Sequence, residues 1–284
     1  MKRDGVNVQP HATRFAKKLV PLAKKAVAGE PAPAVQKGKG GYADWVIIAI
    51  NGLREYLDRP LRYTLDLLRT MYPVCAELGL RPDELPHFTT VCVRVGDLEM
   101  PAWRNLLELA ADLHEIGEIQ AIDATGMDRI AASHHYAKRT GYTFKAAKTT
   151  ILIDCETGAI LDIHCVMKKA GDSKIGWQVL TRNIEKLSKL TADKGYDDEI
   201  LRLRLRAEGV KPLIKHREFT IMDRANNSLI DDKKYNHRLM VESVFHALKR
   251  RYGDFLRSRT WFGQFRELVL KAAVRNVELT LEGP

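Results

Sequence analysis

The chain has 284 residues, 45% of them hydrophobic and 29% charged, which excludes wholesale disorder and allows one large domain or two modest ones. Its four cysteines form no C-x-x-C pair, so we expect neither a zinc site nor a disulfide framework. It has no apolar run of about 18 residues and no apolar segment after Met1-Lys2-Arg3-Asp4, so we expect no membrane span or signal peptide and a cytoplasmic, nucleoid-associated protein. Its net charge of +10 is unevenly distributed. Residues 1–40 contain nine basic and two acidic side chains, residues 41–117 contain seven basic and twelve acidic ones, and residues 118–284 contain thirty basic and twenty-two acidic ones. Two basic regions separated by an acidic one indicate a polyanionic partner contacted at two places.

Residues 1–41 are expected to form a basic tail and linker. Residues 12–28 place apolar and basic side chains at helical spacing, which predicts a short amphipathic helix kinked at Pro21. Residues 29–41 are rich in Gly, Pro and Lys and have no apolar period, as is typical of a linker. We therefore expect the tail to stay mobile until it binds a partner.

Residues 42–117 are expected to form a small helical N-terminal domain. Apolar side chains recur at helical spacing between residues 45 and 57 and again between residues 61 and 71, and prolines divide the stretch into short helices. The segment 87–95 follows Pro86, like the entry to one element of a helix-turn-helix. A bundle that contacts DNA and a purely structural bundle are equally compatible with this pattern.

Residues 118–284 change to alternating strands and helices. The order of three strands, helix, strand, helix, strand and further helices predicts a ribonuclease-H-like α/β domain with a mixed sheet flanked by helices. The first strands resemble an antiparallel meander, with the hairpin turn Glu156-Thr157-Gly158 between two of them. The predicted strands are 119–123, 143–154, 159–167, 190–193 and 211–214, and the predicted helices are 175–187, 197–208, 236–252 and 262–281.

Three carboxylates are the candidate catalytic residues of this domain. Asp123 and Asp193 are each expected at the end of a strand, where open α/β sheets place their ligands, and Gly195 permits a tight exit after Asp193. Glu242 lies within a predicted helix. Taken singly, such Asp residues are usually turn formers or helix caps, so the hypothesis depends on the set.

The predicted helix around Glu242 carries a narrow polar stripe. At about 100° per residue, Tyr235, Arg238, His246 and Lys249 all fall within about 40° of the direction of Glu242. One interpretation is an ordinary solvated face with ion pairs such as Arg238–Glu242. The other is a metal-binding Glu flanked by cations that contact phosphates.

The pattern Tyr235-x-x-Arg238-x-x-x-Glu242-x-x-x-x-x-x-Lys249 resembles the Tyr-Arg-Glu-Lys signature of DDE transposases from bacterial and archaeal insertion sequences. The segments around Asp123 and Asp193 resemble the first and second Asp motifs of the same group. The resemblance covers about residues 42–280 and is strongest after residue 118. Only 49 positions separate Asp193 from Glu242, which leaves little room for the large β-insertion of some relatives.

The resemblance implies a site in which Asp123, Asp193 and Glu242 hold two divalent cations about 4 Å apart, with Asp123 bridging both. An all-oxygen site suits Mg²⁺ or Mn²⁺ rather than zinc, and the nearby histidines are not needed as ligands. Tyr235, Arg238 and Lys249 would support the site and bind phosphate. Without metal the carboxylates would repel one another, so we expect a loose apo site that Mg²⁺ orders.

The activity implied by the resemblance is transposition of DNA. Water would cleave the transposon ends, and the freed 3′-hydroxyl would attack target DNA, both by in-line displacement. The implied partners are double-stranded DNA with terminal inverted repeats, target DNA, and a second copy of the chain in a homodimer on DNA. The alternatives are a non-catalytic DNA-binding derivative and a ribonuclease-H-like nuclease of repair or RNA processing.

Basic pairs outside the signature are candidate contacts to the DNA backbone. Lys168 and Lys169 follow the third predicted strand, and Arg250 and Arg251 extend the Glu242 helix. Solvated surface is the commoner explanation for each of them taken alone. The two tryptophans Trp177 and Trp261 would either stack on a base or, as is commoner, pack in the core.

Overall fold

The computed structural model describes residues 9–27, 32–33, 41–128, 147–166 and 171–281, which divide into two compact units. The first unit comprises Met1–Ala110 and Val274–Pro284, and the second comprises Ala111–Ala273. In the first unit lie helices α1 (His11–Ala26), α2 (Asp44–Leu57), α3 (Leu61–Thr70), α4 (Tyr72–Glu77) and α5 (Phe88–Asp97), and α6 spans Met100–Ala111. No helix among the described residues is long and apolar enough to cross a membrane.

Helix α1 packs against α2, which corrects the expectation of a mobile tail for residues 11–26. The ring of Phe15 stacks on Tyr56 with their centroids 4.1 Å apart. Gly52 lets the two helices approach closely, because a Cβ there would lie 2.6 Å from Leu19 Cδ2. The predicted helix is present with Pro21 on its exposed side, and its buried apolar face anchors it to the unit.

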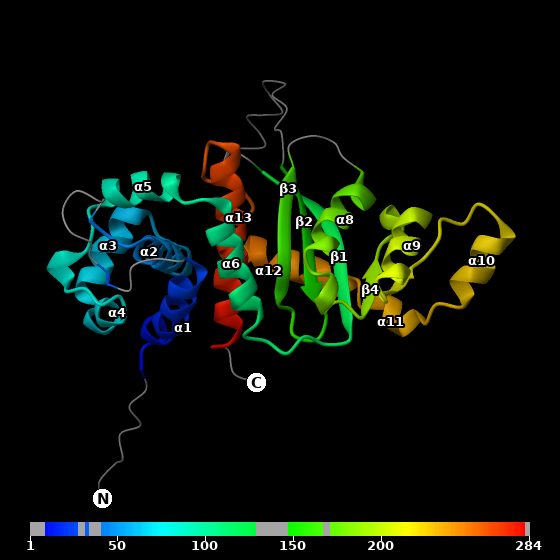
Figure 1. Ribbon diagram of the computed structural model, residues 1–284, viewed down its shortest axis with the longest axis horizontal. Coiled ribbons are helices and arrows are strands. Elements are labelled where there is room, and N and C mark those ends of the chain that lie inside the picture. Colours follow the sequence, from blue (N-terminus) through cyan, green and yellow to red (C-terminus); the bar gives the residue numbers. More distant parts are fainter. Residues whose placement is uncertain (1–8, 28–31, 34–40, 129–146, 167–170, 282–284) are drawn as a thin grey trace, which may run out of the picture. The chain divides into compact units, whose positions relative to one another are not determined.

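A five-stranded mixed sheet of order β3-β2-β1-β4-β5 forms the centre of the second unit (Figure 1). Strands β1 (Ile119–Met127), β2 (Ala147–Asp154) and β3 (Ile160–Val166) form an antiparallel meander. Strands β4 (Lys189–Ala192) and β5 (Lys211–Ile214) run parallel to β1. This order and these directions confirm the predicted ribonuclease-H-like α/β fold.

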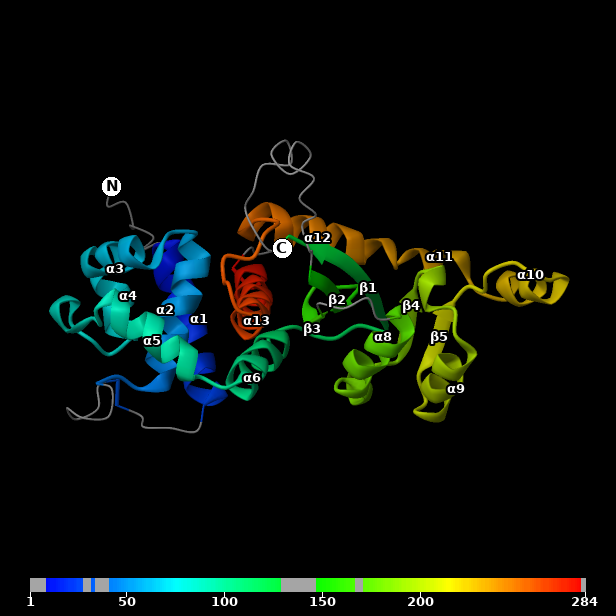
Figure 2. The same cartoon turned by 90° about the horizontal axis from the view of Figure 1, so that it is seen from above.

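Helices cover both faces of the sheet (Figure 2). Helices α8 (Asp172–Thr181) and α9 (Glu199–Ala207) lie on one face, and α11 (Asp232–Asn236) and α12 (Leu239–Tyr252) lie on the other. The core under α8 and α9 includes Ile122 of β1, Val179 of α8 and Leu205 of α9, all at most 1% exposed. Helix α13 spans Trp261–Leu279.

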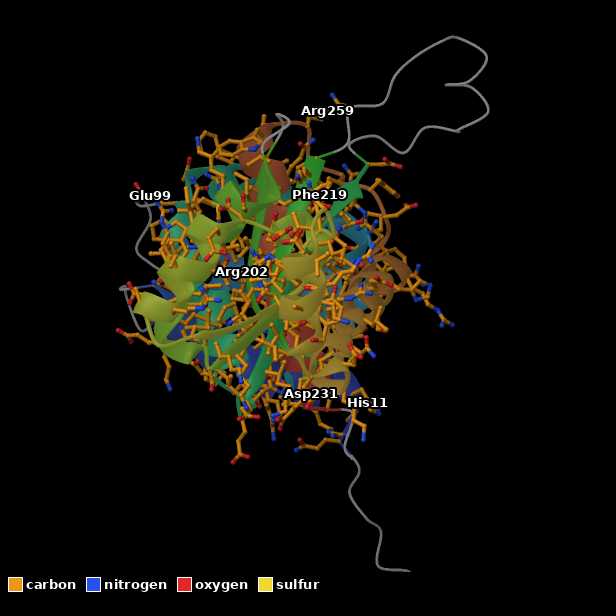
Figure 3. All side chains as sticks on the ribbon, turned by 90° about the vertical axis from the view of Figure 1, so that its right-hand side faces the viewer. His11, Glu99, Arg202, Phe219, Asp231 and Arg259 are labelled. Carbon is orange, nitrogen blue, oxygen red and sulfur yellow. The ribbon has the colours of Figure 1, made fainter. Side chains whose placement is uncertain are left out.

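Three of the departures from the predicted elements concern the candidate site or its surroundings. Strand β1 continues to Met127, so Asp123 lies within it rather than at its end. The predicted helix 236–252 begins at Leu239, and Tyr235 belongs to the separate helix α11. Helix α10 (Ile221–Ser228) was not predicted, although Thr220 and Asp223 form a capping box at its start. Phe219, just before it, is 84% exposed on the side of the unit seen in Figure 3.

Candidate active site

The pairing of β1 with β4 brings Asp123 and Asp193 to neighbouring positions. The parallel ladder ends with Ile122 opposite Ala192, so the next residues along the chain are Asp123 of β1 and Asp193, the first residue after β4. Beyond this point β1 pairs only with β2, which leaves Asp123 at an open position on its β4 side. The two Asp residues therefore lie side by side where β4 ends, which is where an α/β sheet places its ligand.

The loop after β4 is held by its own polar groups. The Asp193 carboxylate accepts a hydrogen bond of 2.8 Å from Gly195 N and caps the 3-10 helix Lys194–Tyr196. A Cβ on Gly195 would lie 2.8 Å from Asp193 Oδ1, so a glycine is needed for this close approach. The backbone of the loop thus fixes the direction of the Asp193 side chain.

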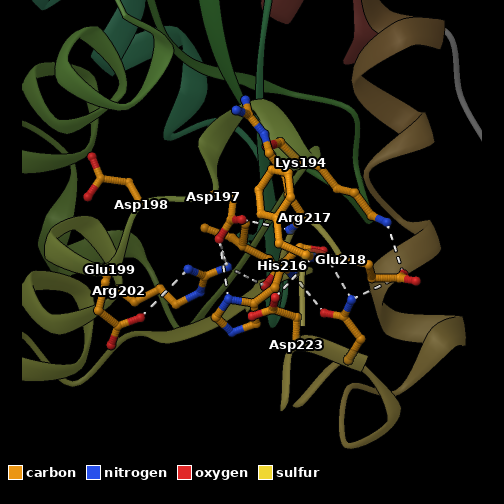
Figure 4. A network of polar contacts seen from close by, with 12 residues as sticks. Lys194, Asp197, Asp198, Glu199, Arg202, His216, Arg217, Glu218 and Asp223 are labelled. Carbon is orange, nitrogen blue, oxygen red and sulfur yellow. Dashed lines mark hydrogen bonds and ion pairs between the residues drawn. The ribbon is translucent and has the colours of Figure 1, made fainter. Parts of the chain in front are cut away.

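A second set of contacts ties this loop to the segment after β5 (Figure 4). Arg217 donates to Lys194 O at 3.0 Å from its side chain and to Asp197 Oδ2 at 2.6 Å from its backbone. Lys194 pairs with Glu218 at 3.2 Å. Asn227 of α10 accepts from His216 N and donates to His216 O. The loop that bears Asp193 is therefore anchored to α10 through backbone and side-chain contacts of the 216–218 segment.

Glu242 lies on α12, which covers the face of the sheet opposite to α8 and α9 (Figure 2). It lies in the first turn of α12, which buries Val241, Val244 and Leu248 and packs on β1 and β2. Its side chain is 64% exposed and lies 4.0 Å from Arg238. An exposed carboxylate on a helix packed against β1 is free to turn toward Asp123.

Lys249 fixes α12 along β1. Its ammonium donates to Thr125 Oγ1 at 3.1 Å and to Gly126 O at 2.9 Å. Thr125 and Gly126 are two and three residues after Asp123 on β1. Since an ammonium has three donors, two of them position the helix and one stays available for a phosphate oxygen.

Burial and the charges of other carboxylates act on the pKa of Asp123. Burial, and then the charges of Asp193, Glu242 and Asp172, raise the pKa of Asp123 to about 6, against an opposing hydrogen bond from Ala124 N. Asp172, in the first turn of α8 and ion-paired with Lys148, was not among the predicted site residues. An acid in the first turn of a helix is too common in sequences to have drawn attention to it.

The donor set fits a divalent cation such as Mg²⁺. The side chains whose charges raise the pKa of Asp123 are carboxylates, which are hard oxygen ligands. Within the described residues, no three acidic, His or Cys side chains stand close enough together to hold an ion as they are. The raised pKa of Asp123 shows nevertheless that their charges act on one another. Binding of a cation would require the carboxylates to turn inward and would relieve their repulsion.

The residues of the four-part signature take different places from those expected on a single helix. Tyr235 is only 6% exposed, between Lys215 and Arg238, whose cationic groups lie 4.8 and 5.1 Å from its ring. Its carbonyl accepts from Thr191 Oγ1 at 3.0 Å. Tyr235 and Arg238 thus lie on either side of the turn between α11 and α12, yet Arg238 still lies beside both Tyr235 and Glu242.

The remaining candidate contacts divide by exposure. Arg250 and Arg251 are exposed in the last turn of α12. Trp177 packs against the core under Arg204, whereas Trp261 is 37% exposed beside Phe262 and Phe265. The candidate residues Lys168 and Lys169 lie outside the described residues.

Replacing Asp123 by Asn is expected to stabilise the metal-free protein at neutral pH. The folded state binds a proton up to about pH 6, whereas the unfolded chain releases it near the ordinary value of 3.8, so stability falls as pH rises between these values. Allowing for partial exposure, we expect a gain of about 1 kcal/mol for the Asn variant at pH 7.5. Urea unfolding in EDTA at pH 7.5 and pH 4 measures it, and the gain should vanish at pH 4.

Exposed Asp254 supplies the control for this measurement. Asp254→Asn should change the free energy of unfolding by less than about 0.5 kcal/mol at either pH. A loss of stability in Asp123→Asn at both pH values would show that the Asp123 carboxylate is a structural group.

Comparison with known proteins finds a family whose model matches the domain that carries these carboxylates. The family model described as the transposase DDE domain matches residues 115–277, which include all three predicted carboxylates. Among solved structures, the cryo-EM structure of a piggyBac transposase synaptic complex with hairpin DNA is similar at 9% identity and a TM-score of 0.43, over 98% of this chain and 68% of that one. No curated protein sequence matches the chain.

Proposed function

Since this chain belongs to the transposase DDE domain family, we propose that it is a DNA transposase that cleaves transposon ends and joins them to target DNA. The observation that carries the proposal is the register of β1 and β4, which sets Asp123 beside Asp193. The charges of these residues and of Glu242 act together at Asp123. The three carboxylates lie in β1, directly after β4 and in α12, and such a set suits the in-line phosphoryl transfer of these enzymes.

Asp123, Asp193 and Glu242 would hold Mg²⁺ or Mn²⁺. The cations would supply charge stabilisation at the scissile phosphate and activate the attacking oxygen. The protein's own part is to aim the carboxylates: Gly195 N fixes Asp193, and Lys249 fixes α12 and with it Glu242. Arg238 and the free donor of Lys249 would hold phosphate oxygens close to this point.

The partner proposed is double-stranded DNA carrying the terminal inverted repeats, followed by target DNA. The exposed Arg250 and Arg251 in the last turn of α12 extend the same helix that carries Glu242 and suit backbone phosphates. Helix α1 adds exposed Lys17, Lys18 and Lys24. Since two DNA ends must be joined together, two copies of the chain are proposed to act as a homodimer on DNA.

Incubation of the protein with DNA that carries the flanking repeats of its own element tests the proposal. With Mg²⁺ we expect cleavage at the repeat ends and joined products with a target plasmid, and with EDTA we expect neither. Sequencing of the products should show free 3′-hydroxyl ends at the repeats. Cleavage without joining would instead indicate a nuclease, and binding without cleavage a non-catalytic derivative.

A further inference from the structure

Tyr196 occupies an apolar site immediately behind the Asp123–Asp193 pair. It ends the 3-10 helix that Asp193 caps, its side chain is 1% exposed, and it belongs to the core under α8 and α9. Gly176 of α8 gives it room, because a Cβ at that position would lie 2.7 Å from Tyr196 Cε1 and 3.5 Å from Ile122 Cδ1. The ring is therefore locked between α8 and β1, beside the residue that precedes Asp123.

The hydroxyl of Tyr196 is the unusual part of this side chain. It is buried and has no hydrogen-bond partner among the described residues. A phenylalanine would fill the same space without the desolvation penalty of an unpaired hydroxyl. A core position that holds Tyr at this cost indicates that the hydroxyl has a use that the metal-free arrangement does not show.

The charges that act on this hydroxyl come from carboxylates at the candidate site. Burial, and then the charges of Asp123, Asp172 and Asp193, raise the pKa of Tyr196 well above its ordinary value. The hydroxyl thus stays protonated and is a hydrogen-bond donor.

We propose that Tyr196 is a positioning residue, whose hydroxyl donates a hydrogen bond to the carboxylate of Asp123 once that carboxylate turns to bind a divalent cation. The inference rests on the proposed function, since it assigns a cation to Asp123. The locked ring fixes the donor before the cation arrives. The hydrogen bond satisfies the buried hydroxyl and holds the second oxygen of the carboxylate, in the way that outer groups orient metal ligands in other proteins.

Tyr196→Phe separates this role from a structural one. In EDTA, the variant should melt about 2–4 °C above wild type, because a buried unpaired hydroxyl has been removed. In calorimetric titration with MgCl₂ alone, its affinity should fall by about tenfold, the usual effect of removing a group that orients a metal ligand. A merely structural tyrosine would change the melting temperature and leave the affinity unchanged.

Two further variants distinguish a positioning role of Tyr196 from a general effect on the fold or on the metal site. Tyr252→Phe alters another buried tyrosine, on α12, and should leave Mg²⁺ affinity within about twofold of wild type. Asp123→Ala should lose the binding that Tyr196→Phe only weakens.

Equal affinity in wild type and Tyr196→Phe would overturn the inference while leaving the proposed function intact. A fall in the melting temperature of metal-free Tyr196→Phe would also overturn it, by showing that the hydroxyl is already paired. Equal affinity in wild type and Asp123→Ala would remove both the inference and the proposed metal site.

Discussion

Glu242→Gln is expected to lower metal-dependent DNA cleavage by about 10³-fold or more while leaving the protein folded. The substitution keeps the shape of the side chain but removes the charge, and a divalent cation held between anionic oxygens supplies several kcal/mol of the transition-state stabilisation. Glu242 is 64% exposed and its contact in the described structure is a 4.0 Å pair with Arg238. Such a pair contributes little to stability, so the loss should appear in catalysis alone.

Single-turnover cleavage of a labelled repeat end in saturating Mg²⁺ measures this effect, with the melting temperature as the check on folding. Glu208→Gln, exposed at the end of α9, is the matched control and should cleave at the wild-type rate. A Glu242→Gln protein within tenfold of wild type would remove Glu242 from the active site and leave a two-carboxylate centre to be explained.

The five strands were predictable from the sequence because each depends on local pattern, whereas the three carboxylates were selected as a set through the resemblance to a family. Short apolar runs between turn residues gave the five strands, and β5 has the predicted bounds of 211–214. The position of Asp123 within its strand was not predictable. Strand β1 continues because β2 pairs with it up to Met127, while β4 stops at Ala192. A strand extension that is paired on only one side has no recognisable periodicity in its sequence.

The break before α12 shows a second limit. The stripe of Tyr235, Arg238, Glu242 and Lys249 has helical spacing, yet Tyr235 lies on α11. No Pro or Gly marks the break, which is a local turn in which Met240 N donates to His237 O and Val241 N donates to Arg238 O. Just before the turn, Tyr235 is buried against Lys215 and its carbonyl accepts from Thr191 of β4, contacts that the spacing of the signature does not predict.

Arg202 illustrates why supporting residues escaped prediction. Residues 201–206 alternate Leu and Arg, and three arginines in a short helix are normally interpreted as solvated surface. Arg202 is only 3% exposed, whereas Arg206 on the same helix is 54% exposed. What distinguishes them is a partner in the loop after Asp193, which the sequence does not place beside α9.

Arg202→Met is expected to destabilise the protein by about 3 kcal/mol. The guanidinium pairs with Asp197 at 2.6 Å and donates to Ile214 O at 3.1 Å, so it joins α9, β5 and the loop that carries Asp193 (Figures 3 and 4). Methionine keeps the apolar stem but leaves a half-buried Asp197 and a buried carbonyl without this donor. Urea unfolding at pH 7.5 measures the loss, and Arg206→Met, whose exposed pair with Glu199 is 3.5 Å long, should cost less than about 0.5 kcal/mol.

The pH dependence of this loss identifies its cause. Burial works to raise the pKa of Asp197, but hydrogen bonds from Arg217 N and Arg202, with the charges of Arg202 and His216, outweigh it and lower that pKa. A carboxyl with a lowered pKa stabilises the fold above its unfolded pKa, and that stability is lost as pH falls through the folded value. The difference between wild type and Arg202→Met should therefore shrink in acid. A difference that stayed constant down to pH 3 would assign the loss to the Ile214 carbonyl and to packing, and would leave the loop of Asp193 without its proposed ionic anchor.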